Sequence, residues 1–381
     1  MSEFLFWLGF FTVLYAYAGY PLALWVISKF AERPVKKGHY EPRVSIILSA
    51  FNEERFIEAK LTNLLQADYP DYKIEIIVGS DGGRDDTDAI VSKFDSERVR
   101  FFRFVKNLGK PHVLNSLMRE AHGTVVVFTD ARQEFPAHSI RELVENFHDP
   151  DVGCVSGELL FRRRADGSIG QGMGAYWTYE KFLRKTESKI GSMLGATGAI
   201  YAIRRQFFVP LPANTLADDM YVPLSIIQKG YRAVFDSKAI AYDEVSSTSR
   251  QEMIRKIRTL AGNWQIFRNM PQLLNPAQST VAIQLISHKL LRLMVPLCIV
   301  VMFLSNLMLM DQTFYQGVMI AQLLFYGFAF WEWRGEKKKI KGKKGIGYLP
   351  YTFCVLNYAA FKSIFYYLSK GKLGTWTKAY E

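Results

Sequence analysis

Long apolar stretches near both ends of the chain frame a central part in which apolar and polar segments alternate. Phe4 to Phe30 carries no charge before Lys29, and at 1.5 Å per residue it is long enough to cross about 30 Å of hydrocarbon. Leu293 to Met310 and Thr313 to Trp333 are two further apolar stretches with only two polar residues between them. The pattern predicts a transmembrane anchor within residues 1–32 and a helical hairpin with a short outer turn.

Basic residues beside these stretches predict their orientation. A cleaved signal peptide has its basic residues before the apolar run, whereas here they follow it, so we expect the first stretch to remain as an anchor. A second basic run, 334–344, follows the hairpin. Basic loops stay on the cytoplasmic side. We therefore expect a multi-pass protein of the plasma (inner) membrane whose central part faces the cytoplasm.

The other segments near the C-terminal end mix charge with apolar residues. Val281 to Arg292 carries three basic or titratable side chains, which fits an interfacial amphipathic helix leading into the membrane. Gly347 to Leu368 is interrupted by Lys362, so it either spans with a snorkelling lysine or lies along the interface. Together, residues 276–370 are expected to form interfacial and transmembrane helices, and 371–381 a tail.

The central part, residues 41–275, alternates between strand-like and helix-like patterns. Val44 to Leu48, Ile74 to Val78 and Gly123 to Phe128 are β-branched or apolar runs, and a helical stretch covers about 54–66. Such alternation predicts an α/β domain with a mostly parallel sheet. Ligands of these sheets bind beyond the carboxyl ends of the strands. The residues just after each strand are therefore the candidates for chemistry.

Composition agrees with a membrane enzyme. The chain has 381 residues, 49% of them hydrophobic, and a net charge of +12. Because the positive residues gather beside apolar segments, we attribute the charge to membrane topology and to anionic lipids, not to nucleic acid. The three cysteines, Cys154, Cys298 and Cys354, provide neither a disulfide framework nor a zinc spacing.

Acidic residues follow the predicted strands in an order that suits sugar transfer from a nucleotide donor. Asp130 follows one strand directly, and the adjacent Asp218 and Asp219 come later. Such a reaction needs one acid to hold a metal on the diphosphate and another to deprotonate the acceptor hydroxyl. The simpler interpretation is that Asp218 and Asp219 only cap a helix over 220–228.

Two other turns carry polar groups. Asp81 stands after the second strand, before a glycine turn, where it can accept a hydrogen bond from a base or a ribose. Lys110 ends the run Lys106 to Lys110, whose flexible turn and cation suit a phosphate or a sugar. An ordinary turn with a helix cap explains residues 82–86 equally well.

This ordered set of motifs resembles the inverting family 2 glycosyltransferases. The motif segments are 44–54, 80–87, 107–110, 129–132 and 217–219. The flanking helices resemble the branch that contains hyaluronan, chitin, cellulose and poly-N-acetylglucosamine synthases. The resemblance implies a GT-A fold, a nucleotide-diphosphate sugar donor, a divalent metal (Mg²⁺ or Mn²⁺) and one-step inversion at the anomeric carbon.

The resemblance also implies roles for single residues. Asp219 matches the general base, with Asp218 beside it, and Asp130 matches the first carboxylate of the metal motif. The implied donor-binding residues are Asn52, Glu53, Asp81, Lys110, Asp130, Arg132, Arg255 and Arg258. The implied acceptor-binding residues are Gly195, Thr197, Gly198 and Trp264.

Two departures from the family pattern stand out. Arg132 occupies the second carboxylate position of the metal motif; either Asp130 alone holds the cation with water and phosphates, or Arg132 neutralises part of the diphosphate. On the acceptor side, Thr259 stands where the family has a tryptophan, and Trp264 lies five residues further on. A basic helix resting on lipid headgroups is the alternative for this stretch.

We therefore expect an inverting transferase that uses a nucleotide sugar, UDP-linked, to extend a polysaccharide at the membrane. The alternatives are transfer of one sugar to a polyprenyl phosphate or other lipid-linked acceptor, and a catalytically silent nucleotide-sugar sensor subunit. The expected partners are the donor, a glycan or lipid-linked acceptor, membrane lipids, and an export partner or a second copy of the chain. We expect no nucleic acid.

Overall fold

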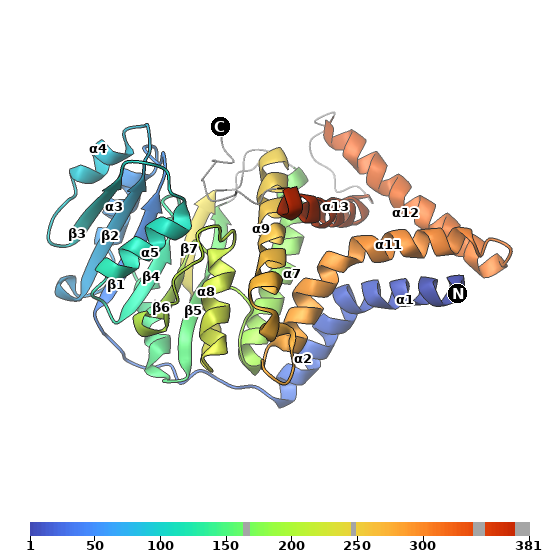
Figure 1. Ribbon diagram of the computed structural model, residues 1–381, viewed down its shortest axis with the longest axis horizontal. Helices are drawn as coiled ribbons and strands as arrows, with labels where there is room; N and C mark the ends of the chain where they lie inside the picture. Colours follow the sequence, from blue (N-terminus) through green and yellow to red (C-terminus); the bar gives the residue numbers. More distant parts are fainter. Residues whose placement is uncertain (163–167, 245–248, 338–346, 370–381) are drawn as a thin grey trace. The chain divides into compact units, whose positions relative to one another are not determined.

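The computed structural model describes residues 1–162, 168–244, 249–337 and 347–369. Within them the chain forms two compact units (Figure 1). Of the described residues, the sheet unit contains 31–162 and 184–244, and the helical unit contains 1–30, 168–183, 249–337 and 347–369. One long helix, α7 (Ser168–Ile190), has residues in both units. Each unit is described by itself below.

A seven-stranded sheet forms the centre of the sheet unit, in the order β3-β2-β1-β4-β6-β5-β7. Its strands are β1 (Val44–Ala50), β2 (Ile74–Asp81), β3 (Val99–Phe104), β4 (Val125–Thr129), β5 (Val152–Arg162), β6 (Tyr201–Arg204) and β7 (Arg232–Glu244). Pairing is parallel from β3 through β2 and β1 to β4, and again between β5 and β7. Only β6 runs antiparallel to its neighbours β4 and β5.

This arrangement confirms the predicted α/β class and the three predicted strands. Val44, Ile74 and Val125 lie side by side at the beginnings of their strands. The polar turns after β1, β2 and β4 therefore leave the same edge of the sheet. Since β6 is antiparallel to β4, the segment that precedes β6 also reaches this edge.

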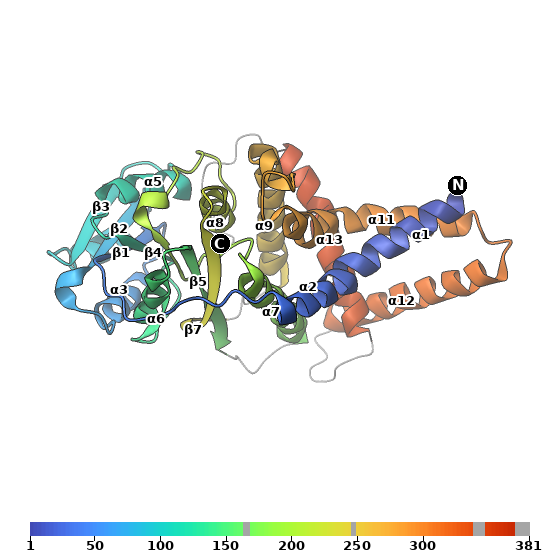
Figure 2. The same ribbon diagram turned by 90° about the horizontal axis from the view of Figure 1, so that it is seen from below.

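Helices cover both faces of the sheet. On one face, α3 (Ile57–Leu65) and α6 (Ser139–Glu145) contribute Leu61 and Leu143 to the same buried cluster as Ile46 and Val127. The opposite face carries α5 (Lys110–Glu120), as Figure 2 shows. An added Cβ at Gly79 of β2 would lie 2.6 Å from Val113 of α5, so α5 packs directly on the strand. The shorter helices are η2 (Asp71–Lys73), α4 (Thr87–Ser92), η3 (Asn146–His148), η4 (Arg205–Phe207) and α8 (Asp218–Gln228).

Three helices of the helical unit are long and apolar enough to cross a membrane: Ser2–Phe30, Ala282–Leu307 and Thr313–Gly335. The first is built from α1 (Ser2–Leu14), a π-helical segment η1 (Tyr15–Gly19) and α2 (Tyr20–Phe30). The second contains α10 (Ala282–Gln284), a π-helical segment η6 (Leu285–Leu290) and α11 (Leu291–Leu307), and the third lies within α12 (Thr313–Lys337). Helices α1 and α11 run side by side in both views (Figures 1 and 2). The predicted anchor and hairpin are present as helices.

The segment Val281 to Arg292, for which the sequence predicts an interfacial helix leading into the membrane, is continuous with the apolar helix that follows it. It is the first part of the continuous helix Ala282–Leu307, and its polar side chains converge on Glu180 of α7. Arg292 and His288 hydrogen-bond the two oxygens of this carboxylate, and Lys289 lies 3.7 Å from it. The charges that resembled a headgroup-facing surface are thus buried in an ion-pair cluster, which removes the cost of placing them in an apolar helix.

The remaining helices of this unit are α9 (Ser249–Asn269), η5 (Pro271–Leu274) and α13 (Tyr348–Ser369). Trp264 of α9 donates from its indole nitrogen to the Ser363 hydroxyl of α13 at 3.2 Å. α13 covers the stretch 347–368, for which the sequence allows either a membrane span or an interfacial helix. It is not among the three candidate spans of the described residues. Most of the basic run 334–344 lies outside the described residues. The bounds predicted for the central domain, 41–275, stay a prediction.

Candidate active site

A cluster of charged side chains lies at the carboxyl edge of the sheet, around the Lys110 ammonium. Lys110 begins α5, and its Nζ lies 3.0 Å from Oδ1 of Asp130, just after β4, and 3.3 Å from Oδ2 of Asp218, at the start of α8. Burial alone would lower the pKa of Lys110, but Asp130, Asp218 and Asp219 raise it more, so it stays charged. One half-buried cation therefore joins the two acidic motifs that the sequence separates by 88 residues.

Asp219 is half-buried and directly follows Asp218 in this cluster. Burial and the neighbouring Asp218 raise its pKa from 3.8 to about 6, while Lys110 and Arg184 oppose the change. A carboxylate with this pKa is mostly ionised at neutral pH yet holds a proton better than an exposed acid. Those are the properties of a general base that works near neutrality.

Asp218 and Asp219 are the first two residues of α8, after the N-cap Ala217. No side-chain capping hydrogen bond is formed at this N-terminus, so the interpretation of both acids as mere caps receives no support. Negative charge in the first turn is still favoured by the helix dipole. The helix therefore positions both carboxylates, and neither of them is its N-cap.

The glycine-containing segment 195–198 lies against Asp219. The Ala196 amide donates to the Asp219 carbonyl at 2.7 Å. An added Cβ at Gly198 would lie 3.3 Å from Oδ2 of Asp219, whereas one at Gly195 would meet Met220 at an ordinary 3.5 Å. The structure thus brings Gly195 and Gly198 next to the predicted base, while a role of this segment in acceptor binding stays a prediction.

Asp81 is fully buried and supports the turn in front of Lys110. Its two oxygens accept hydrogen bonds from the amides of Leu108 at 2.7 Å and Gly109 at 2.9 Å. Burial raises its pKa, and the two amides oppose this change. Gly109 needs its left-handed backbone, with φ of 89°. In this structure Asp81 therefore fastens the loop that places Lys110, and its contact with a nucleotide base stays a prediction.

The turns after β1 and β2 are joined through side chains. Oδ1 of Asn52, itself in the left-handed region with φ of 52°, accepts from the Arg84 amide at 2.8 Å. The Glu53 amide donates to the Thr87 hydroxyl at 2.7 Å. Asn52 and Glu53 therefore shape this edge of the sheet, next to the turn that contains Asp81.

Arg132 and three residues of α9 are the remaining site predictions. Arg132 is half-buried, two residues after Asp130. Arg255, Arg258 and Trp264 lie on α9 in the helical unit. Their part in donor or acceptor binding remains a prediction.

Two residues of this region were not found by sequence reasoning. Nη1 of Arg184, on α7, donates to the Thr197 hydroxyl at 2.7 Å. The Tyr201 hydroxyl is fully buried and makes no hydrogen bond to any described residue. Burial, Asp218 and Asp219 all raise its pKa. Neither residue belongs to a motif, so the sequence held no signal for them.

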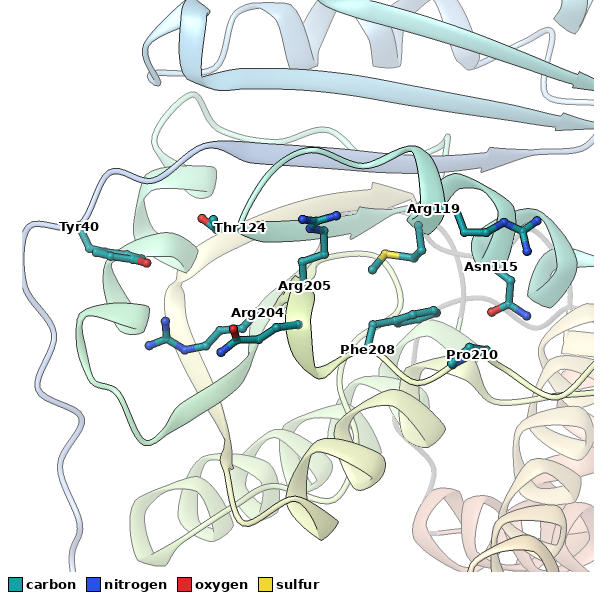
Figure 3. Close-up of a pocket in the computed structure, with 10 residues that line it drawn as sticks. Tyr40, Asn115, Arg119, Thr124, Arg204, Arg205, Phe208 and Pro210 are labelled. Atoms are coloured by element: carbon teal, nitrogen blue, oxygen red, sulfur yellow. The ribbon is translucent and has the colours of Figure 1, made fainter.

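A cavity of about 610 Å³ lies at the opposite edge of the sheet (Figure 3). Its lining includes Thr124, which precedes β4 by one residue, and therefore lies about 20 Å from Asp130 along the strand. Three arginines line it, but they bind nearby groups: Arg204 the carbonyls of Phe147, Asp149 and Val152, Arg205 that of Ala121, and Arg119 the Ser116 hydroxyl. Figure 3 shows the three guanidinium groups pointing apart, so the carboxylate cluster is the stronger candidate.

Sequence comparison agrees with this choice, because residues 45–209 match the model of glycosyl transferase family 2. This part of the chain is a family 2 glycosyltransferase domain. The matched range contains β1 to β6, Lys110, Asp130 and residues 195–200. The predicted family and the predicted enzyme class are confirmed.

Curated relatives are similar over the same region. The chain is 24% identical over 233 residues to "Poly-beta-1,6-N-acetyl-D-glucosamine synthase" of Staphylococcus aureus (strain COL), covering 58% of this chain and 55% of that protein. It is 26% identical, with the same coverage, to "Probable glycosyltransferase YdaM" of Bacillus subtilis (strain 168). The chain thus spans about half the length of the curated relatives it matches.

One solved structure is similar along almost the whole chain. The mannosyltransferase PcManGT from Pyrobaculum calidifontis, in complex with GDP-Man and Mn²⁺, superposes with a TM-score of 0.74 at 22% identity. The match covers 97% of this chain and 100% of that one. This likeness shows the fold and confirms the predicted GT-A class with additional helices.

Proposed function

We propose that the protein is a membrane-integrated inverting glycosyltransferase that transfers a sugar from a nucleotide-diphosphate donor to a glycan acceptor. The observation that carries the proposal is the cluster in which Lys110 joins Asp130 to Asp218, beside Asp219 with its raised pKa. A separated acid for the donor side and an acid with a raised pKa for the acceptor side are the two groups that this reaction needs.

The proposed reaction is a single displacement. The oxygen of an acceptor hydroxyl forms a bond to the anomeric carbon while the bond from that carbon to the diphosphate oxygen breaks, and Asp219 takes the hydroxyl proton. Lys110 provides positive charge where the diphosphate leaves. Arg132, close in sequence to Asp130, is proposed to neutralise part of the same charge.

A divalent cation on the donor diphosphate fits one side chain of this site. Among the described residues, no group of three or more histidines, cysteines or acids is arranged to hold a metal. Asp130 is 39% exposed, and Mg²⁺ commonly takes only one or two carboxylates together with phosphate oxygens and water. We propose that Asp130 holds Mg²⁺ or Mn²⁺, which would neutralise charge on the diphosphate.

The donor and the acceptor are proposed from chemistry shared with the relatives. The curated relatives named as poly-β-1,6-N-acetyl-D-glucosamine synthases favour a polysaccharide product and a UDP-linked donor, while the structural neighbour was solved with GDP-Man. A lipid-linked acceptor remains the second candidate, because three helices among the described residues are long and apolar enough to cross a membrane. The sheet unit is proposed to face the cytoplasm, where nucleotide sugars are made.

Release of nucleoside diphosphate tests the proposal. Detergent-purified protein is incubated with UDP- and GDP-linked sugars, with Mg²⁺ or Mn²⁺ and with chelator, and product length is read on a gel. We expect metal-dependent release from one donor, lost in Asp219→Asn and retained in Asp95→Asn, which removes a carboxylate from the exposed surface. Absence of diphosphate release with every donor would refute the proposal. Full activity in the presence of chelator would refute the proposed metal requirement.

A further inference from the structure

The segment 195–200, called the acceptor loop below, connects the two acidic motifs of the site. At one end, the Ala196 amide donates to the Asp219 carbonyl at 2.7 Å. At the other end, the Ala199 carbonyl accepts from the Thr129 hydroxyl at 3.0 Å, and Thr129 directly precedes Asp130. A shift of this loop would therefore change the placement of Asp219 relative to Asp130.

Thr197 lies at the middle of the acceptor loop and is held by two groups. Its amide donates to the Ser156 hydroxyl of β5 at 2.9 Å, and its own hydroxyl accepts from Arg184 at 2.7 Å. Thr197 is only 8% exposed. A buried bond from a charged donor is stronger than one between neutral groups, so Arg184 is the stronger of the two restraints.

Gly198 transmits the position of this loop to the base. The closest approach of an added Cβ, 3.3 Å, is to Oδ2 of Asp219, so the Gly198 backbone already lies against the carboxylate. The Asp219 carboxylate therefore has little space on the side that faces Gly198. If Thr197 moves, Gly198 moves next to the oxygen that would take the proton.

We propose that Arg184 is a positioning residue of the transfer site, which holds Thr197 and thereby fixes the acceptor loop against Asp219. The inference rests on the proposed function, because it takes Asp219 as the base. Arg184 acts through Thr197 and does not touch the reacting atoms. Its charge has a second effect in the same direction, since it favours the ionised form of Asp219.

Four variants separate position from charge. Thr197→Val removes the hydrogen bond but keeps the arginine, Arg184→Gln removes the charge, and Arg184→Lys keeps a charged donor. Lys185→Gln is the matched control, because it removes one positive charge from the neighbouring, exposed position of the same helix. Each variant is assayed for diphosphate release over a range of acceptor concentrations and of pH, and for donor binding.

We expect Thr197→Val and Arg184→Gln to lower kcat by about 10- to 100-fold, as small misplacements of reacting groups do, with donor affinity unchanged. Arg184→Lys should recover most of the loss, and Lys185→Gln should match the wild type. Only Arg184→Gln should move the acid limb of the pH profile upward. Unchanged kcat in Arg184→Gln, or a loss explained by reduced thermal stability alone, overturns the proposal.

A second measurement needs no turnover. The difference in melting temperature between the wild type and Asp219→Asn is followed from pH 4 to 8, with and without Arg184→Gln. If Arg184 acts on Asp219, Arg184→Gln should raise the pH at which this difference levels off, because the pKa of Asp219 in the folded chain rises without the guanidinium. If the wild type releases no diphosphate yet this shift is seen, the proposed function fails and the link between Arg184 and Asp219 stands; if the shift is absent, that link fails.

Discussion

The raised pKa of Asp219 makes a quantitative prediction for the variant Asp219→Asn. The pKa changes from 3.8 to about 6, and each pH unit of such a change corresponds to about 1.4 kcal/mol. Ionised Asp219 therefore lowers the free energy of unfolding by about 3 kcal/mol. Asparagine has nearly the same volume and cannot ionise, so the variant escapes this cost.

The sign follows from the order of the two pKa values. Below about pH 4 the acid is protonated in both the folded and the unfolded chain, and its titration contributes nothing. As pH rises toward 6 the unfolded chain ionises first, so the wild type loses stability. Above about pH 6 the loss is complete and constant. The stability of Asp219→Asn relative to the wild type should thus increase between pH 4 and 6 and then level off.

Thermal unfolding in detergent, monitored by intrinsic tryptophan fluorescence, measures this difference. A change of about 3 kcal/mol corresponds to several degrees in melting temperature for a protein of this size. The asparagine also leaves Lys110 with one acid fewer, but that effect should not vary with pH in this range, since Lys110 stays charged. A stability difference that is flat from pH 4 to 8 would refute the raised pKa. In the same variant, transfer should fall by about 10²–10⁴-fold, the usual contribution of a general base.

Three other predictions follow from packing and topology. Gly198→Ala should lower transfer at least several-fold because its methyl group would press on the base, whereas Gly195→Ala should be tolerated; equal effects would contradict this geometry. Tyr201→Phe should raise the free energy of unfolding by about 1–3 kcal/mol, because it removes a buried hydroxyl without a described partner. Tyr69→Phe should lower the free energy of unfolding, because the Tyr69 hydroxyl donates to a carbonyl at 2.6 Å. Denaturant-induced unfolding of both variants measures the sign of each change. A cysteine at Asp311, in a chain without its native cysteines, should react with an impermeant reagent in intact cells, and failure to label would reverse the proposed topology.

Much of the sheet unit was predictable because its signals are local. Val44 to Leu48 and Ile74 to Val78 are short β-branched runs between polar turns, and both are strands in the structure. The rule that parallel strands end at one edge then placed Asp81 and Asp130 at that edge. The order of the strands beyond β4 cannot be predicted from a local pattern. The reversal of β6, which brings the acceptor loop to the same edge, follows from pairing between segments more than 70 residues apart.

The helical unit shows where local reasoning fails. His288, Lys289 and Arg292 in an apolar helix indicate a headgroup-facing surface if their partner is not known. The partner is Glu180, which lies 108 residues before His288. Similarly, the Trp264 indole hydrogen-bonds Ser363 of a helix that begins 84 residues after it. In both cases the burial of a polar group depends on a contact that spacing cannot reveal.

Lys110 shows why the candidate site needed the structure. From the sequence, a lysine after a glycine turn suggested a phosphate contact, and the acids suggested separate roles. In the structure the same ammonium lies between Asp130 and Asp218 and lowers the pKa of Asp219. Without this charge, burial and Asp218 would raise that pKa further, and a larger fraction of the base would be protonated at neutral pH. Lys110 therefore has two functions in the proposed mechanism: it provides charge for the leaving diphosphate, and it keeps the acceptor base ionised.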